Sequence, residues 1–282
     1  MIKAPILVIA RLTLKEAVRR KIVLGALLLG LVFLLVFGLG MHFTDEEMSR
    51  TGQAVNALVR NQMLNFLLLS GLYAVNFLFA AVTVLASVDT IAGEIASGTI
   101  HALAAKPIRR FEILIGKWLG LMIMLTVYLV LMTGGVIGLT RIATDYQPHH
   151  VLEALVLLWL NGFVLLSLTL LGGTRFSTLA NGVLVFAGFG VAFVGGWVEQ
   201  IGSLAGSAAA VKVGIVSSLL VPTEALWRRA AYEMRSVMVD AVGVSPFTSG
   251  ASVPSQLMIV YAGVYAIVAL ALAVWRFGRQ DL

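Results

Sequence analysis

The chain alternates long apolar runs with short polar segments. Helices of about 20 residues cross the ~30 Å hydrocarbon core of a bilayer, and six of the runs are long enough to do so. These spans are predicted at about residues 22–41, 64–87, 111–139, 151–171, 183–200 and 256–275. The pattern therefore predicts a polytopic helical membrane protein.

A basic amphipathic helix is predicted ahead of the first span, at residues 5–21. At 100° per residue, Arg11, Lys15 and Arg19 share one face and apolar side chains share the other, which is typical of a helix at the membrane surface. The same charges could be the ordinary positive flank of the first span, and the two interpretations are compatible.

Residues 203–250 depart from the pattern. Residues 203–221 are moderately apolar and contain Lys212, and an amphipathic stretch beginning PTEALWRR follows. We expect helices on the outer surface or dipping part-way into the membrane. A further full span is the alternative, although Lys212 near its middle would cost about 2.5–3.5 kcal/mol.

Composition supports a single all-α integral membrane domain over residues 1–282. Hydrophobic residues make up 60% of the chain and the mean hydropathy is +0.98, against about 45–50% apolar residues in soluble domains. The net charge of +6 comes from basic residues at the ends of apolar runs, so it indicates topology rather than nucleic-acid binding. The chain has no cysteine, which excludes disulfides and thiolate chemistry.

The distribution of charge predicts the orientation. With six spans and a cytoplasmic N-terminus, the inner segments hold most of the 20 Lys and Arg residues but a minority of the 14 acidic ones. This bias predicts that both termini are cytoplasmic. It also places the strongly charged segment at residues 87–120 on the cytoplasmic side.

That charged segment is predicted to begin with a helix at residues 89–105. Asp89 can cap the helix, and Glu94 projects from its first or second turn. Gly98 and Thr99 allow another surface to approach closely.

The same segment then breaks and restarts. Lys106 precedes Pro107 and is therefore disfavoured in helical conformation, and Arg109 and Arg110 stand before the next helix. A short helix joined rigidly to a span can transmit force from a partner. The alternative is a plain cytoplasmic loop with snorkelling basic residues.

Two spans carry polar or small residues on one face. Polar side chains within a bilayer face protein or water, because an unpaired amide in lipid costs several kcal/mol. The stripes either make hydrogen bonds between helices or form the wall of a substrate path. The path candidates are Tyr73, Asn76, Thr83 and Ser87 on the second span and Asn181, Gly188 and Gly195 on the fifth.

No catalytic motif stands out. The stretch GEIASGT at residues 93–99 lacks the lysine and the spacing of a phosphate-binding loop, so we expect no ATPase activity. We also expect no cofactor or metal in this chain. His149, His150 and Glu153 could place two metal ligands one helical turn apart. The preferred interpretation is that they are interfacial residues at the start of the fourth span.

The sequence DTIAGEIASGTIHALAAKPIRRFEILIGKWLG, at residues 89–120, resembles the coupling-helix segment of type-2 ABC exporter permeases. The resemblance is strongest to the branch that includes the permease of the nitrous-oxide-reductase maturation transporter. In the same family, the basic N-terminal helix is similar to the connecting helix, and the PTEALWRR stretch to the outer helices between spans five and six.

The resemblance implies a homodimer, or a dimer with a paralogous permease, in a bacterial or archaeal plasma membrane. A separate cytoplasmic ATPase subunit would bind ATP and Mg²⁺. The path would lie between the second and fifth spans of the two halves. The alternative is a subunit that conveys force to a periplasmic protein without moving a solute.

The resemblance also implies which residues meet the ATPase. The coupling helix would seat in a groove of that subunit, and the break after it completes the coupling segment. The contacts implied are Asp89, Glu94, Gly98, Thr99 and Arg109, with Lys106, Pro107 and Arg110 in the same segment.

Overall fold

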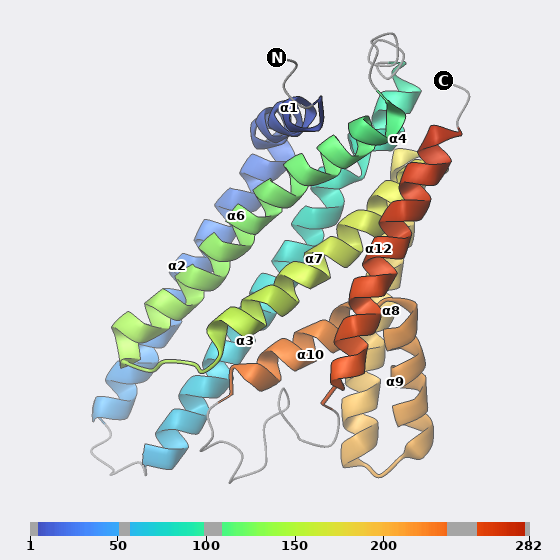
Figure 1. Cartoon of the computed structure of the whole chain (residues 1–282). Helices are drawn as coiled ribbons and strands as arrows, with labels where there is room; N and C mark the ends of the chain where they lie inside the picture. Colours follow the sequence, from blue (N-terminus) through green and yellow to red (C-terminus); the bar gives the residue numbers. More distant parts are fainter. Residues whose placement is uncertain (1–4, 51–56, 99–108, 236–252, 280–282) are drawn as a thin grey trace.

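A computed structural model describes residues 5–50, 57–98, 109–235 and 253–279, which are helical apart from short connections. The helices are α1 (Pro5–Arg19), α2 (Lys21–Arg50), α3 (Ala57–Ser87), α4 (Asp89–Ala96), α6 (Arg110–Thr144), α7 (Val151–Gly173), α8 (Thr178–Leu204), α9 (Ala208–Leu220), α10 (Thr223–Glu233) and α12 (Gln256–Gly278) (Figure 1).

Six of the described helices are long and apolar enough to cross a membrane, namely α2, α3 with α4, α6, α7, α8 and α12. The predicted all-helical integral membrane fold is therefore confirmed. The helices run past the predicted spans because their polar flanks contain nothing that stops a helix. For example, α6 continues to Thr144 and ends where Asp145 takes up a left-handed conformation, with φ 56°.

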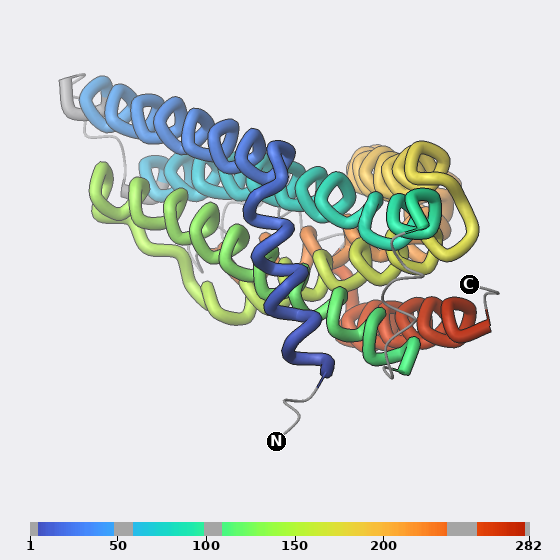
Figure 2. Tube along the Cα trace, turned by 90° about the horizontal axis from the view of Figure 1, so that it is seen from above, coloured from blue at the N-terminus to red at the C-terminus, as the bar shows by residue number. Residues whose placement is uncertain are grey.

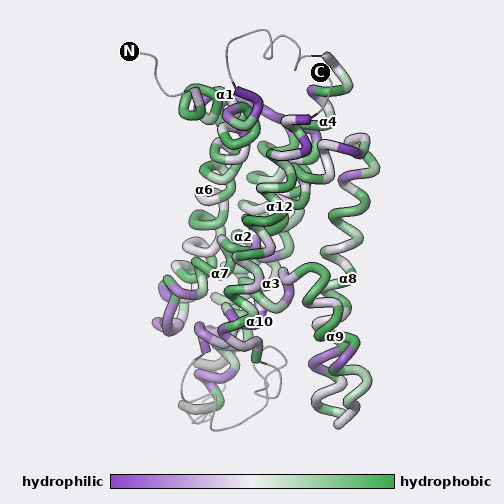
Figure 3. Tube along the Cα trace, turned by 45° about the vertical axis from the view of Figure 1, so that its right-hand side comes forward, coloured by the Kyte–Doolittle hydropathy of each residue, from purple (hydrophilic) through white to green (hydrophobic). Residues whose placement is uncertain are grey.

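The centre of the bundle is formed by α3, α6 and α7, whose apolar residues are mostly buried. The outer helices α2, α8 and α12 leave most of their apolar side chains at least partly exposed. Figure 3 shows apolar residues along the length of these helices, with hydrophilic residues concentrated toward the two ends of the bundle. Exposed apolar faces of this extent are suited to lipid or to a second membrane subunit.

The first helix lies across one end of the bundle (Figure 2). It crosses α6 at Gly116 and Gly120, which lie on the same face because they are four residues apart. A Cβ at Gly116 would meet Ile9 Cβ at 2.7 Å, and one at Gly120 would meet the Ala10 carbonyl oxygen at 2.5 Å. The two glycines thus form a notch that lets the backbones of α1 and α6 approach closely.

The segment predicted as outer helices contains α9 and α10. Helix α9 packs antiparallel to α8, and the chain then bends by 105° into α10, which packs chiefly on α7 (Figure 1). Lys212 is exposed on α9. The predicted segment from 203 to 250 therefore contains two short helices as far as residue 235, and residues 236–250 lie outside the described residues.

Two buried contacts hold α9 and α10 against α8. Ser217 of α9 fills the space over Gly195 of α8. Arg228 of α10 donates a hydrogen bond to Glu199 of α8 at 2.8 Å, and both side chains are at least nine-tenths buried. A buried ion pair of this kind strongly disfavours separation of the two helices, because separation would leave each charge uncompensated.

Candidate functional site

The short helix α4 continues α3 almost without interruption. Val88, which joins them, is itself helical with φ −57° and ψ −36°, and its N–H donates to the Val84 carbonyl oxygen at 2.9 Å. The prediction that Asp89 caps a new helix is therefore wrong, because the backbone is already helical before it. Helix α4 is thus a direct backbone continuation of α3.

An ion pair holds α4 against α6. Lys117 of α6 is buried and its ammonium group pairs with the carboxylate of Glu94. The same ammonium donates to the Thr90 carbonyl oxygen at 3.2 Å. Glu94 is a predicted ATPase contact, but in the structure its carboxylate points toward α6 and is only 17% exposed.

Asp89 lies at the meeting point of three other elements. Its carboxylate is 3.8 Å from the guanidinium of Arg20, which lies between α1 and α2, and accepts from the hydroxyl of Thr178 at the start of α8 at 3.4 Å. Arg20 also pairs with Glu16 of α1 at 2.7 Å. Helix α4 is thus connected to α1, α2, α6 and α8 at one end of the bundle.

The tip of α4 is the exposed part of this arrangement. Ala96 and Ser97 are exposed, and Gly98 ends the helix with φ 70°, a conformation that glycine adopts without steric cost. The remaining residues of the predicted coupling segment up to 108, including Thr99, Lys106 and Pro107, lie outside the described residues.

The other two predicted coupling residues lie at the start of α6. The Arg109 N–H donates to the Glu112 carboxylate at 2.9 Å, which satisfies one of the free amides at the helix start. Arg110 donates to the Gly278 carbonyl oxygen at 3.5 Å and so links α6 to the end of α12.

Lys117 and the notch formed by Gly116 and Gly120 were not predicted as functional residues. The signal was present in the sequence as two glycines four residues apart with a lysine between them, at the cytoplasmic end of a predicted span. Such spacing indicates close helix packing. The partner of Lys117 could be found only in three dimensions.

The polar residues on α3 are paired inside the chain. Asn76 accepts from the amide of Asn161 on α7 at 2.7 Å. Thr83 and Ser87 donate to carbonyl oxygens one turn earlier, at 2.7 and 2.6 Å. The side chains of Asn76, Thr83, Ser87 and Asn161 are all buried. Within this chain they therefore make contacts inside α3 or between α3 and α7.

Tyr73 belongs to an aromatic face shared by α3 and α8. Its ring stacks on Phe193 at 5.7 Å between centroids, and its hydroxyl accepts from the indole N–H of Trp197 at 2.9 Å. Phe77 lies one turn further along α3, contacts Phe193 at 6.4 Å, and is 52% exposed. Tyr73 is one of the predicted path residues and the phenylalanines are not, because aromatic residues in a span are unremarkable by composition.

The three candidates on α8 divide between two places. Asn181 donates to the Thr169 carbonyl oxygen of α7 at 2.8 Å, and with Gly188 it lines a cavity of about 310 Å³ bordered by α7, α8 and α12. Gly195 is covered by Ser217 of α9. The structure therefore does not bring the seven path candidates together into one cavity in the part of the chain that it describes.

Of the three possible metal ligands in the sequence, His150 and Glu153 lie together and His149 does not join them. The Nδ1 atom of His150 is 3.1 Å from a carboxylate oxygen of Glu153. Glu233, at the end of α10, approaches both, so that ligand atoms from the three residues lie within 4.8 Å of one another.

The fold and the α4 contacts define a multi-pass helical membrane protein in which the second span ends in a short helix linked to several neighbours. Residues 7–282 match a family described as ABC-2 family transporter protein, and the chain belongs to that family. No curated protein matches it. ABC-2 proteins are permease subunits of ABC transporters and typically work with an ATPase subunit.

Proposed function

We propose that this permease subunit moves a solute outward across a bacterial or archaeal plasma membrane, driven by ATP hydrolysis in a separate subunit. The α4 end would face the cytoplasm, and α4 would be the coupling helix. The observation that carries the proposal is the direct continuation of α3 into α4, together with the ion pair between Glu94 and Lys117. Together they supply a short path for force from the ATPase into two spans.

The exposed tip of α4 is the proposed contact with the ATPase. Ala96 and Ser97 are accessible there, and Asp89 is 53% exposed on its side-chain surface. Glu94 and Lys117 would act inside the permease by keeping α4 in register with α6. Arg109 and Arg110 would complete the contact from the start of α6, with residues 99–108 between them.

The path is proposed to run along the aromatic face of α3 and α8, where two permease subunits would meet. Phe77 is exposed on that face, and Tyr73 and Phe193 stack beside it. The exposed apolar sides of α2, α8 and α12 support a homodimer or a dimer with a paralogous permease, with lipid covering the remainder. Aromatic walls suit an amphiphilic or apolar solute better than an ion.

A second candidate function is the transmission of force to a periplasmic protein without movement of a solute. It is favoured by one observation: Asn76, Thr83 and Ser87 are buried in contacts within the chain. Phe77→Ala and Phe193→Ala separate the two candidates in a strain that lacks the chromosomal copy. If the protein is a transporter, the variants should fail to rescue the phenotype of the deletion strain but should keep permease-dependent ATP hydrolysis. If it is a force transmitter, the variants should rescue the phenotype and keep that hydrolysis.

The proposal is tested by ATP hydrolysis. The chain is co-expressed with the ABC ATPase encoded in the neighbouring reading frame, and the purified complex is compared with the ATPase alone. Ser97→Arg, at the tip of α4, is expected to abolish permease-dependent hydrolysis. Ile142→Arg is the matched control, because Ile142 is 85% exposed at the opposite end of α6.

Equal hydrolysis in the Ser97→Arg and control complexes would contradict the coupling role of α4. Failure of the ATPase to co-purify with the wild-type chain would contradict the partnership itself. Glu94→Arg is a less specific variant, because it would place a second cation against Lys117 and disturb the permease from within.

A further inference from the structure

Three side chains able to ligate a metal meet at the end of the bundle opposite α4. His150 precedes α7, Glu153 lies in its first turn, and Glu233 is the last residue of α10. One ligand atom from each lies within 4.8 Å of the others. His150 and Glu153 are well exposed, so an ion can reach the group from solvent, whereas the side chain of Glu233 is only 17% exposed.

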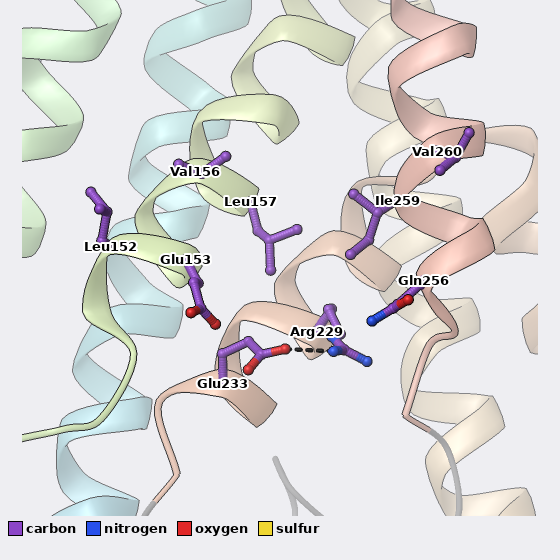
Figure 4. A pocket seen from close by; sticks show the side chains of 9 residues that line it. All are labelled: Leu152, Glu153, Val156, Leu157, Arg229, Glu233, Gln256, Ile259 and Val260. Carbon is purple, nitrogen blue, oxygen red and sulfur yellow. Dashed lines mark ion pairs between the residues drawn. The ribbon is translucent and has the colours of Figure 1, made fainter.

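Figure 4 shows the two carboxylates of this group. Glu153 and Glu233 point toward one another at the mouth of a pocket of about 700 Å³ bordered by α7, α10 and α12. The pocket walls beyond the mouth are apolar, with Val156, Leu157 and Ile259 among them. The carboxylates are therefore confined to one rim of an apolar pocket.

Glu233 is held in place by a neighbour on its own helix. Arg229 pairs with its Oε1 atom at 2.6 Å, and the other arm of the guanidinium donates to the Pro254 carbonyl oxygen at 3.3 Å. A carboxylate has two oxygens, so Oε2 can bind an ion while Oε1 keeps the arginine. Outer partners of this kind orient metal-binding carboxylates in known sites.

The backbone of His150 supports the same geometry. It has φ 46° and ψ 38°, a left-handed conformation that few residues other than glycine adopt, although histidine does so more often than most. The imidazole makes no capping hydrogen bond to the start of α7 and instead lies against Glu153.

We propose that His150, Glu153 and Glu233 form a binding site for a divalent transition-metal ion of the zinc type. One imidazole and two carboxylates are a donor set that suits Zn²⁺, whereas Mg²⁺ and Ca²⁺ prefer oxygen ligands throughout. The carboxylate of Glu153 offsets part of the charge of the ion, Glu233 shares its charge with Arg229, and three protein ligands leave a position open. A bound ion connects the start of α7 to the end of α10.

The site does not rest on the proposed transport function and is tested by metal binding alone. The full chain is purified in detergent with a tag that contains no histidine, stripped with EDTA, and titrated with ZnCl₂ by calorimetry. We expect one Zn²⁺ per chain and no comparable binding of MgCl₂. Zn²⁺ is also expected to raise the melting temperature, because a ligand of the folded state stabilises it.

Two variants and one control locate the ion. His150→Ala and Glu233→Gln are expected to weaken Zn²⁺ binding by at least about tenfold, since loss of even an outer partner costs about 10–100-fold. Glu233→Gln can keep a hydrogen bond to Arg229. The size-exclusion elution profile of this variant checks that it is folded. His149→Ala, a change at the adjacent exposed histidine, is expected to bind like wild type.

Three results would overturn the site. The first is that the stripped wild-type chain binds no Zn²⁺. The second is that Zn²⁺ binding is unchanged in His150→Ala and Glu233→Gln. The third is that His149→Ala loses as much affinity for Zn²⁺ as those two variants.

Discussion

Lys117 of α6 is buried and pairs with Glu94 of α4, while also donating to the Thr90 carbonyl oxygen at 3.2 Å. One ammonium group thus contacts both the side chain and the backbone of the short helix that continues the second span. The buried lysine thus has a carboxylate and a carbonyl oxygen as partners, in surroundings that also include Thr13, Glu16 and Arg20. It also joins α4 to a second span besides the one it extends.

Removing Lys117 should destabilise the α4 end of the bundle. Lys117→Met leaves a poorly solvated carboxylate without its partner, which costs about 3 kcal/mol for a pair of this burial. Thermal unfolding in detergent measures the loss. The double variant Lys117→Met with Glu94→Gln should recover much of it, and an equally unstable double variant would show that the ion pair is not the cause.

The notch on α6 should control the position of α1. Gly120→Leu places a side chain where the Ala10 backbone lies, so α1 should be displaced from the bundle end. A spin label on α1 should then show greater mobility than in the wild-type chain. Gly134→Leu is the control on the same helix, because a Cβ there meets nothing within 4 Å. Unchanged mobility in Gly120→Leu would contradict this packing.

The amide pair between α3 and α7 should behave as a structural contact. Asn161→Leu leaves the Asn76 amide unsatisfied in apolar surroundings, at a cost of about 1–3 kcal/mol. A double-mutant cycle with Asn76→Leu should give a coupling energy of about 0.6–1.7 kcal/mol, as for other hydrogen bonds within membranes. A coupling energy near zero would mean that the two amides do not interact.

The hairpin of α8 and α9 should depend on one small residue. Gly195→Ala adds a methyl group where Ser217 lies, and overpacking of this kind costs about 1–3 kcal/mol. Gly190→Ala on the same helix has open space around it and should be close to neutral. Combining Gly195→Ala with Ser217→Gly should restore stability, and failure to do so would place the clash elsewhere.

The spans were predictable from sequence because apolar runs of about 20 residues have few alternatives to a membrane helix. The continuation of α3 into α4 was not, since Asp89 is a good capping residue and its presence favoured a new helix start. Whether Val88 stays helical depends on packing of Thr90 and Ile91, both buried, against the rest of the bundle.

Contacts between distant segments were the least predictable part. The polar residues on α3 were compatible with both a path and helix packing, and periodicity alone does not distinguish a side chain that faces a neighbouring helix from one that faces water. Lys117 stands near the start of the predicted third span, but nothing in the sequence pairs it with Glu94. The approach of Glu233 to His150 is likewise a consequence of the 105° bend between α9 and α10.

The most direct test of the account uses the absence of cysteine from the chain. A single cysteine introduced at Ser97 carries a photoactivatable crosslinker in membranes that also contain the neighbouring ABC ATPase. If α4 is the coupling helix, a crosslink to the ATPase should form from Ser97 and be lost on competition with excess unlabelled permease, and none should form from a cysteine at Ile142. Crosslinking from Ile142 but not from Ser97 would place the ATPase at the wrong end of the bundle and contradict the assignment of α4 as the coupling helix.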